Sequence, residues 1–240
     1  MKKIIIALLA LLVFTGCAKT GEPVAQDDPV INEPTGEDEM LAGGWTINDS
    51  LPEVNDLYFD QARKKIVGAT YSPLFILGTQ PVGGTNYMYL AYKTNVVPNA
   101  LPELKMVTVF KDVDENAEAE IVNVADFNIT DYLDDNGSTT PDGLMGGWKD
   151  ETELPNMLSD EDNAVFEKAM EGLVGVGYTP VATLASQVVA GTNYAFLAVG
   201  TTVTAEPVSH LYIVKVYNDL QGNAQVSNIC GLDLSKFNNK

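Results

Sequence analysis

Few side chains of this chain are suited to covalent chemistry. The sequence contains one histidine, His210, and two cysteines, Cys17 and Cys230. A structural zinc site takes four ligands and a thiol nucleophile needs a neighbouring base, so this supply is too small for either kind of site. We predict that His210 is a surface residue at the start of a strand and that Cys230 is a buried, inert thiol. The residue types therefore predict a protein without enzymatic activity, metal or cofactor.

One acidic stretch resembles the beginning of a calcium-binding loop. Asp112, Asp114 and Asn116 stand at alternate positions, as the first three ligands of such a loop do. The sixth position is Ala117, where a glycine is needed, and the twelfth is Asn123, where a glutamate is needed. We therefore predict no calcium site in this stretch.

The charge of the chain excludes a large class of partners. Its 240 residues include 14 Lys and Arg against 33 Asp and Glu, for a net charge of -19. A surface this acidic repels phosphate backbones, which excludes nucleic acid as a partner. Hydrophobic residues make up 45% of the chain, enough for a buried core in one large domain or two small ones.

The N-terminal residues have the features of a targeting segment. Residues 1–16 combine Lys2 and Lys3 with an apolar run that is too short to span a bilayer, as in a secretory signal. The residues before Cys17 resemble the lipobox of bacterial lipoproteins, with Phe14 in place of the usual Leu. The resemblance implies cleavage before Cys17, acylation of its sulfur, and anchoring in the cell membrane or outer membrane, facing outside the cytoplasm. The alternative is a plain secretory signal with an incidental cysteine.

Acylation would have two consequences for the mature chain. With Cys17 acylated, Cys230 would be the only free thiol, so no disulfide could form within the chain. The stretch 17–40 is rich in Pro, Gly and acids, which predicts a disordered tether between lipid and folded protein.

An internal repeat organises the rest of the chain. Residues 70–91 and 177–198 are identical at eleven of 22 positions at an offset of 107, where ordinary composition gives roughly one or two. The repeat predicts two modules, 41–128 and 144–240. Between them, residues 129–143 are rich in Asp, Asn, Gly, Ser, Thr and Pro, which predicts a flexible linker and loosely joined modules.

Each module begins with helical periodicity and continues with strands. In the second module, the apolar stripe from Val165 to Val174 follows Ser159, a predicted N-cap. In the first module, Ser50 and Glu53 form a predicted capping box before a stripe that ends at Ile66. The predicted strands are 70–79, 85–95, 104–111, 119–127, 177–186, 192–202, 208–217 and 225–234. Short turns between them favour antiparallel meanders, and thus an α+β fold.

The repeated turns carry a family resemblance. Residues 80–84 and 187–191 both fit Q-x-V-x-G, each continues into Thr-Asn-Tyr, and each module has a Gly-Gly pair before its helix. In this order the residues resemble cystatins, the protein inhibitors of papain-like cysteine proteases. The resemblance implies two tandem cystatin-like domains, each with a single helix packed on a five-stranded antiparallel sheet. It also implies a monomer that blocks the protease cleft reversibly and competitively, without chemistry of its own.

The resemblance further implies a wedge made of a leader and two hairpins in each module. In the leaders, apolar side chains would enter the protease pockets and a glycine would let the chain bend. In the first hairpins, small residues would allow close backbone approach, and the glutamines would brace the loop. In the second hairpins, only one apolar residue stands at each tip. The implied protease-binding residues are Leu41, Ala42, Gly43, Gln80, Val82, Gly83, Gly84 and Val113 in the first module, and Leu144, Met145, Gly146, Gln187, Val188, Val189, Ala190, Gly191 and Leu220 in the second.

Two alternatives stand beside this interpretation. Gly84 and Gly191 could be ordinary turn residues, and neither second hairpin has the Pro-Trp or Leu-Pro pair of the family. A non-inhibitory cell-surface binding or adhesion module with the same fold is therefore the competing function. Under the wedge hypothesis, Trp at both Gly84 and Gly191 abolishes inhibition and leaves the fold intact.

Overall fold

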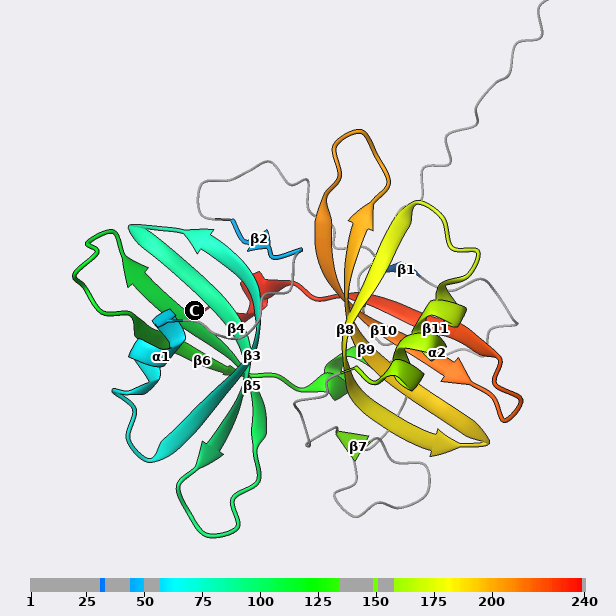
Figure 1. The fold of residues 1–240 in the computed structure, drawn as a ribbon, viewed down its shortest axis with the longest axis horizontal. Helices are drawn as coiled ribbons and strands as arrows, with labels where there is room; N and C mark the ends of the chain where they lie inside the picture. The colour runs from blue at the N-terminus through cyan, green and yellow to red at the C-terminus, as the bar shows by residue number, and fades with distance from the viewer. Residues whose placement is uncertain (1–30, 33–43, 50–56, 134–148, 151–157, 239–240) are drawn as a thin grey trace, which may run out of the picture.

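Two β-sheets, each with one helix, make up the fold (Figure 1). The computed structural model describes residues 31–32, 44–49, 57–133, 149–150 and 158–238. The first sheet has the order β2 (Thr46–Ile47), β3 (Ala69–Pro81), β4 (Gly84–Asn95), β5 (Glu103–Asp112) and β6 (Glu120–Asp126). The second has the order β1 (Ile31–Asn32), β11 (Ala224–Gly231), β10 (Ser209–Asn218), β9 (Gly191–Thr202), β8 (Val176–Val189) and β7 (Lys149–Asp150). The helices are α1 (Leu57–Arg63) and α2 (Asp160–Met170).

The predicted α+β class and the eight predicted strands are confirmed. Each of β3–β6 and β8–β11 lies within three residues of its predicted bounds, and all pair with their neighbours in antiparallel meanders. The short β1 is the exception, because it joins β11 in parallel. It places two residues of the predicted disordered tether in the second sheet, so that prediction was wrong for residues 31–32.

An N-cap serine and a glycine with positive φ set the two ends of helix α2. The Ser159 hydroxyl accepts a hydrogen bond from the Asp162 N–H at 3.0 Å, so the predicted N-cap is confirmed. The helix buries Phe166 against Phe196, with ring centroids 5.1 Å apart. It stops before Gly172, which has φ +86°. The predicted stripe therefore ends too late, because Val174 lies beyond the helix and is 91% exposed.

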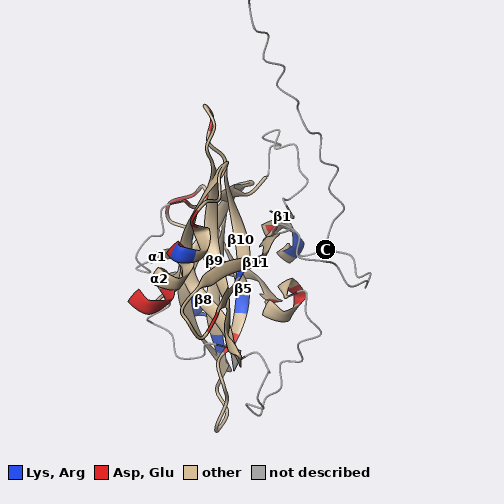
Figure 2. Ribbon diagram, turned by 90° about the vertical axis from the view of Figure 1, so that its right-hand side faces the viewer, with Lys and Arg blue, Asp and Glu red and all other residues tan. Residues whose placement is uncertain are grey.

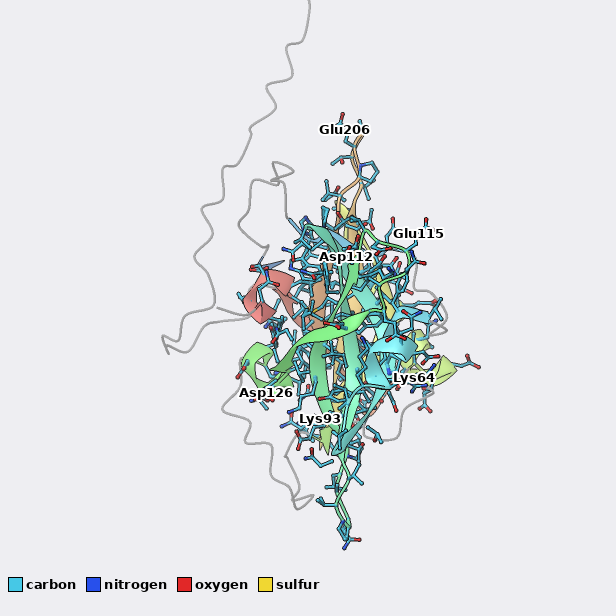
Figure 3. The ribbon with its side chains drawn as sticks, turned by 90° about the vertical axis from the view of Figure 1, so that its left-hand side faces the viewer. Lys64, Lys93, Asp112, Glu115, Asp126 and Glu206 are labelled. Atoms are coloured by element: carbon cyan, nitrogen blue, oxygen red, sulfur yellow. The ribbon has the colours of Figure 1, made fainter. Side chains whose placement is uncertain are left out.

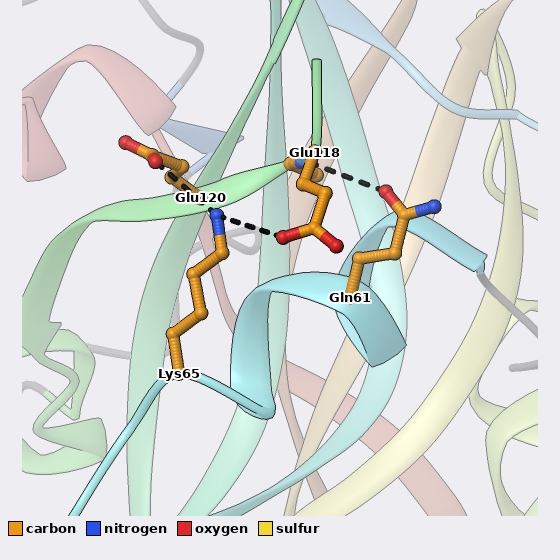
Figure 4. A network of polar contacts seen from close by, with 5 residues as sticks. Gln61, Lys65, Glu118 and Glu120 are labelled. Atoms are coloured by element: carbon orange, nitrogen blue, oxygen red, sulfur yellow. Dashed lines mark hydrogen bonds and ion pairs between the residues drawn. The ribbon is translucent and has the colours of Figure 1, made fainter. Parts of the chain in front are cut away.

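Helix α1 packs on its own sheet and is fastened to the start of β6. Phe59 is fully buried against Tyr89, at 4.8 Å between ring centroids. The Gln61 side chain accepts a hydrogen bond from the Ala119 N–H, and Lys65 Nζ lies 3.4 Å from Glu118 and 3.2 Å from Glu120 (Figure 4). These contacts fix helix α1 to the segment of chain that directly follows the second hairpin. The predicted capping box lies outside the described residues.

The other faces of the two sheets pack against each other. One buried cluster contains Leu77, Met88 and Leu90 of the first sheet together with Leu184, Leu197 and Ile213 of the second. The helices lie on the outer sides of this pair of sheets (Figure 1). The expectation of loosely joined modules was therefore wrong, because each sheet covers apolar surface of the other.

The C-terminal segment crosses from the second sheet to the first. After β11, the 3₁₀ helix η2 (Leu234–Phe237) places Phe237 6.2 Å from Phe127, between ring centroids. The Phe237 carbonyl accepts a hydrogen bond from Asn123 Nδ2 at 2.5 Å, and Trp45 Nε1 donates to Asn238 at 3.3 Å. The end of the second module thus completes the core of the first.

The segment that follows the first module also belongs to the core. The 3₁₀ helix η1 (Ile129–Tyr132) follows β6 and, in the view of Figure 1, lies where the two sheets meet. Ile129 and Leu133 are buried in the shared cluster, at 5% and 6% exposure. The prediction of a flexible linker was therefore wrong for residues 129–133; residues 134–143 lie outside the described residues.

Candidate functional site

Three segments of the first module meet at one end of its sheet. The β3–β4 turn closes with Pro81 opposite Thr85, and Gly84 at the start of β4 lies opposite Asp112, where the second hairpin begins. On the other side of β3, Thr46 pairs with Thr79, so the exposed Gly44 lies beside this turn. The chain at the start of β2 and both hairpins are thus neighbours, an arrangement that the wedge hypothesis requires.

The second module repeats this arrangement. Val189 pairs with Gly191 at the β8–β9 turn, and Asn218 at the end of β10 pairs with Thr192. Lys149 of β7 pairs with Ser186 just before the turn. The six leader residues predicted to bind protease lie outside the described residues: Leu41, Ala42, Gly43, Leu144, Met145 and Gly146.

A pair of carboxamides braces each first hairpin. Asn86 Nδ2 donates to Gln80 Oε1 at 2.9 Å, and Asn193 Nδ2 donates to Gln187 Oε1 at 2.6 Å. Gln187 is only 9% exposed. The bracing role predicted for the two glutamines is therefore confirmed. Their partners were missed, although both asparagines stand in the repeated Thr-Asn-Tyr sequence.

The two motif glycines are required by the sheet itself. A Cβ atom at Gly84 would lie 2.4 Å from the Lys111 carbonyl oxygen, and one at Gly191 would lie 2.4 Å from that of Asn218. Gly191 also has φ +125°. The expectation that Trp at both positions would leave the fold intact was therefore wrong, because the neighbouring strand occupies the space of any side chain.

The exposed tips of the first hairpins are small and aliphatic. Val82 is 48% exposed, and a Cβ at Gly83 would meet no atom within 4 Å. In the second module, Val188 is 69% exposed and Val189 is 42% exposed. The exposed Ala190 follows, and its carbonyl accepts a hydrogen bond from the Tyr217 hydroxyl at 2.5 Å. These tips offer a narrow, apolar contact with a braced backbone.

The second hairpin of the first module is an acidic loop with one exposed valine. Val113 is 80% exposed. The Asp112 carboxylate accepts from the Asp114 N–H, and the Asp114 carboxylate accepts from the Asn116 N–H, both at 2.9 Å. Hydrogen bonds from Asn116 lower the pKa of Asp114. The carboxylates that resemble calcium ligands therefore shape the turn, and the exposed Glu115 lies at its outer edge (Figure 3).

The second hairpin of the second module is built around one aspartate. Asp219 accepts from the N–H groups of Gln221 and Asn223, both at 2.8 Å, and hydrogen bonds from Asn223 lower its pKa. Lys168 of α2 donates to the Gly222 carbonyl at 2.5 Å. Leu220 at the tip is 77% exposed. Helix α2 and this loop are thus joined. In the first module Lys65, two residues after the end of α1, makes the corresponding contact with Glu118 and Glu120.

A shallow pocket of about 250 Å³ lies behind the first hairpin of the first module. Its lining side chains are uncharged: Gln80, Asn86, Thr108, Val122, Asn123 and Asn238. Such a lining offers no acid or base for proton transfer. Among the residues that the structure describes, no group of three His, Cys, Asp or Glu side chains is placed to hold a metal.

The two residues singled out for possible chemistry lie away from the hairpins. His210 is part-buried near the start of β10, with its ring 6.4 Å from that of Tyr212. Cys230 is 6% exposed, as predicted for a buried thiol.

Comparisons with protein families, curated proteins and solved structures find no significant match to this chain. The α+β fold is therefore established by the structure alone. No helix in the described part of the chain has both the length and the apolar character needed to span a membrane.

Proposed function

We propose that this protein is a reversible, competitive inhibitor of papain-like cysteine proteases. In each module, the leader and two hairpins enter the protease cleft as a wedge and exclude substrate. The protein is not an enzyme, needs no cofactor and works as a monomer. The observation that carries the proposal is the meeting of both hairpins and the leader strand at one end of each sheet.

The shape and polarity of the hairpins support this proposal. A cleft accepts a narrow loop whose tip is apolar and whose backbone is already ordered, because little entropy is then lost on binding. Val82 and Val188 supply exposed apolar tips, and the Gln80–Asn86 and Gln187–Asn193 pairs order the loops behind them.

The two hairpin ends lie on opposite sides of the molecule (Figure 1). The first points away from the second sheet, and the second points away from the first sheet. A protease bound at one end therefore leaves the other end open. We expect one chain to bind two protease molecules, without a flexible linker between the sites.

Titration of papain with the soluble chain from Ala18 to Lys240 tests the proposal. We expect inhibition with up to two papain molecules bound per chain, measured by residual activity and by mass. Val188→Asp with Leu220→Asp places charges at both tips of the second module. Loss of such anchors costs about 2 kcal/mol, which is about thirtyfold in affinity at that site.

Val82→Asp with Val113→Asp is the corresponding variant of the first module. The control is Val203→Asp, because Val203 is 74% exposed and lies at the opposite end of the second sheet. The control should inhibit as well as the unmodified chain. If the unmodified chain does not inhibit papain, or if all three variants inhibit equally, the wedge is wrong.

The second candidate function is a non-inhibitory cell-surface binding module. Gly84 and Gly191 favour it, because the sheet requires both glycines whether or not a protease binds. The lack of an aromatic residue in either second hairpin favours it too. In this case the soluble chain would leave papain active and would retain a surface protein from its own cells, and hairpin variants would lose that protein.

We also propose that Cys17 is acylated and anchors the protein outside the cytoplasm, in the cell membrane or outer membrane. The apolar run and the lipobox-like residues before Cys17 support this proposal. Two acyl chains bind a membrane stably. Growth with a labelled fatty acid should label the full chain but not Cys17→Ser, and an unlabelled full chain would exclude the anchor.

A further inference from the structure

One aromatic position beside the first hairpin differs between the two modules. Phe110 of β5 pairs with Asn86, and Tyr217 of β10 pairs with Asn193. Both asparagines brace their hairpins, and the two aromatic residues stand at the same offset of 107 as the repeated segments. Phe110 and Tyr217 therefore hold equivalent places, and the modules differ there by a single hydroxyl group.

Each of these rings lies against the glycine that ends its motif. A Cβ atom at Gly84 would lie 2.6 Å from Cε2 of Phe110, and one at Gly191 would lie 3.0 Å from Cε2 of Tyr217. The Tyr217 hydroxyl donates to the Ala190 carbonyl at 2.5 Å, which is at the short end of the range for O–H···O hydrogen bonds. The Phe110 ring has no hydroxyl, so it cannot make the corresponding bond.

The tyrosine hydroxyl holds a peptide group whose orientation depends on Gly191. The Ala190 carbonyl belongs to the peptide bond between Ala190 and Gly191, so the φ angle of Gly191 sets its direction relative to β9. This angle is +125°, a conformation that residues with a side chain rarely adopt. Gly84 is equivalent to Gly191, but its φ lies outside this region. The two tips therefore differ in backbone conformation, and the tip with the positive φ is the one that Tyr217 holds.

The two tips also differ in the conformational freedom that binding must remove. The first tip contains Gly83 and Gly84 in succession, where the second contains Ala190 and Gly191. Glycine loses more conformational freedom on ordering than any other residue. Entry into a cleft orders either tip, so the entropic cost is greater in the first module. In the second module the hydroxyl bond lowers this cost further, because it orders the peptide before binding.

We propose that Tyr217 is a positioning residue that orders the first hairpin of the second module and makes this module the tighter of the two protease sites. The difference in affinity rests on the proposed function, whereas the order of the hairpin can be measured in the free chain. The strands that form this hairpin, β8 and β9, contain no charged residue and are tan in Figure 2. No ion pair can therefore form within the hairpin, and hydrogen bonds must order it.

Hydrogen exchange in the free soluble chain tests the ordering. Tyr217→Phe removes the hydroxyl and keeps the ring, and the first module shows that the fold accepts phenylalanine at this place. We expect amide exchange in residues 189–192 to become about fivefold faster, as for the loss of one neutral hydrogen bond. Exchange in residues 82–85 is the internal reference and should not change.

The reverse substitution should order the first module. Phe110→Tyr supplies the missing hydroxyl, and the two glycines of the first tip can take the backbone conformation of Ala190 and Gly191. We expect amide exchange in residues 82–85 to become about fivefold slower. A gain of order cannot result from damage to the fold, so it separates positioning from a merely structural role.

Papain titration tests the effect on affinity at one site at a time. With the first site weakened by Val82→Asp and Val113→Asp, Tyr217→Phe should weaken papain binding about fivefold. With the second site weakened by its own two aspartates instead, Phe110→Tyr should strengthen binding about fivefold.

The exchange and affinity measurements distinguish this inference from the proposed function. Unchanged exchange in either Tyr217→Phe or Phe110→Tyr would overturn the inference, and so would faster exchange in Tyr217→Phe with unchanged papain binding. If the unmodified chain does not inhibit papain and Tyr217→Phe still accelerates exchange, the proposed function fails and the ordering role of Tyr217 stands.

Discussion

At the scale of single residues, the glycines of the two Q-x-V-x-G motifs have two possible explanations: entry of the hairpin into a cleft, or close packing against the neighbouring strand. The Q-x-V-x-G pattern suggests small residues for entry into a cleft. In the structure, the glycine of each motif faces the next strand, where the Lys111 and Asn218 carbonyl oxygens leave no room for a Cβ atom. The residue that remains available for binding is the valine at each tip, together with Gly83 and Ala190.

Gly84→Ala should destabilise the protein, and Gly83→Ala should not. An added methyl at Gly84 meets backbone at 2.4 Å, and overpacking of this kind costs about 1–3 kcal/mol. At Gly83 no atom lies within 4 Å. The free energy of unfolding, measured with denaturant, checks both variants. Equal stability of the two would show that the sheet tolerates a side chain at Gly84.

Asp219 should make the second hairpin of the second module sensitive to acid. Its folded pKa is lowered from 3.8, chiefly by the hydrogen bonds from Asn223. A carboxylate with a depressed pKa stabilises the fold above its unfolded pKa, and this contribution disappears as the pH falls through the folded pKa. A ¹³C NMR titration of the Asp219 carboxylate should therefore give a midpoint below 3.8. Asn223→Ala should move the midpoint upward, and an unchanged midpoint would contradict the assigned cause.

At the scale of elements, the strands were predictable because their patterns are local. In β6 the exposed and part-buried residues alternate, as expected for a half-covered edge strand. Residues 194–199 of β9 and 211–216 of β10 are nearly continuous apolar runs, and their central parts are buried on both faces. Such runs signal a second covering layer, but they do not say which layer covers them.

Phe237→Ala should weaken the first module, although Phe237 belongs to the C-terminal segment of the second. Phe237 is 9% exposed and contacts Phe127, and removal of a buried phenylalanine costs about 3 kcal/mol or more. Hydrogen exchange should accelerate in β3 and β6, far from the substitution in the sequence. Val113→Ala at an exposed tip is the control and should leave exchange in both strands unchanged. Acceleration confined to β11 would contradict the crossing of the tail.

At the scale of the whole molecule, the two modules form one cooperative unit. The shared cluster contains residues of both sheets and of the segments η1 and η2. Separated modules would expose this face to water, so an experiment on an isolated module would not report on the native protein. The soluble chain as a whole is therefore the protein to use in the protease measurements.

Calorimetry should therefore show a single unfolding transition. For a cooperative unit, the calorimetric and van't Hoff enthalpies agree. Leu197→Ala, which removes a fully buried side chain from the shared cluster, should lower the midpoint without splitting the transition. Two separate transitions in the unmodified chain would show that the sheets unfold independently.

The sequence by itself determined the start of α2, the strands to within three residues, the repeat and the places of the hairpins. Periodicity, capping by Ser159 and turn composition act over a few residues and need no knowledge of distant neighbours. Only the tertiary structure decided that the sheets share a core, that the tail after β11 crosses to the first sheet, and which glycines the neighbouring strands require. These features depend on contacts between residues far apart in the chain, and burial on both faces of a strand does not specify its partner.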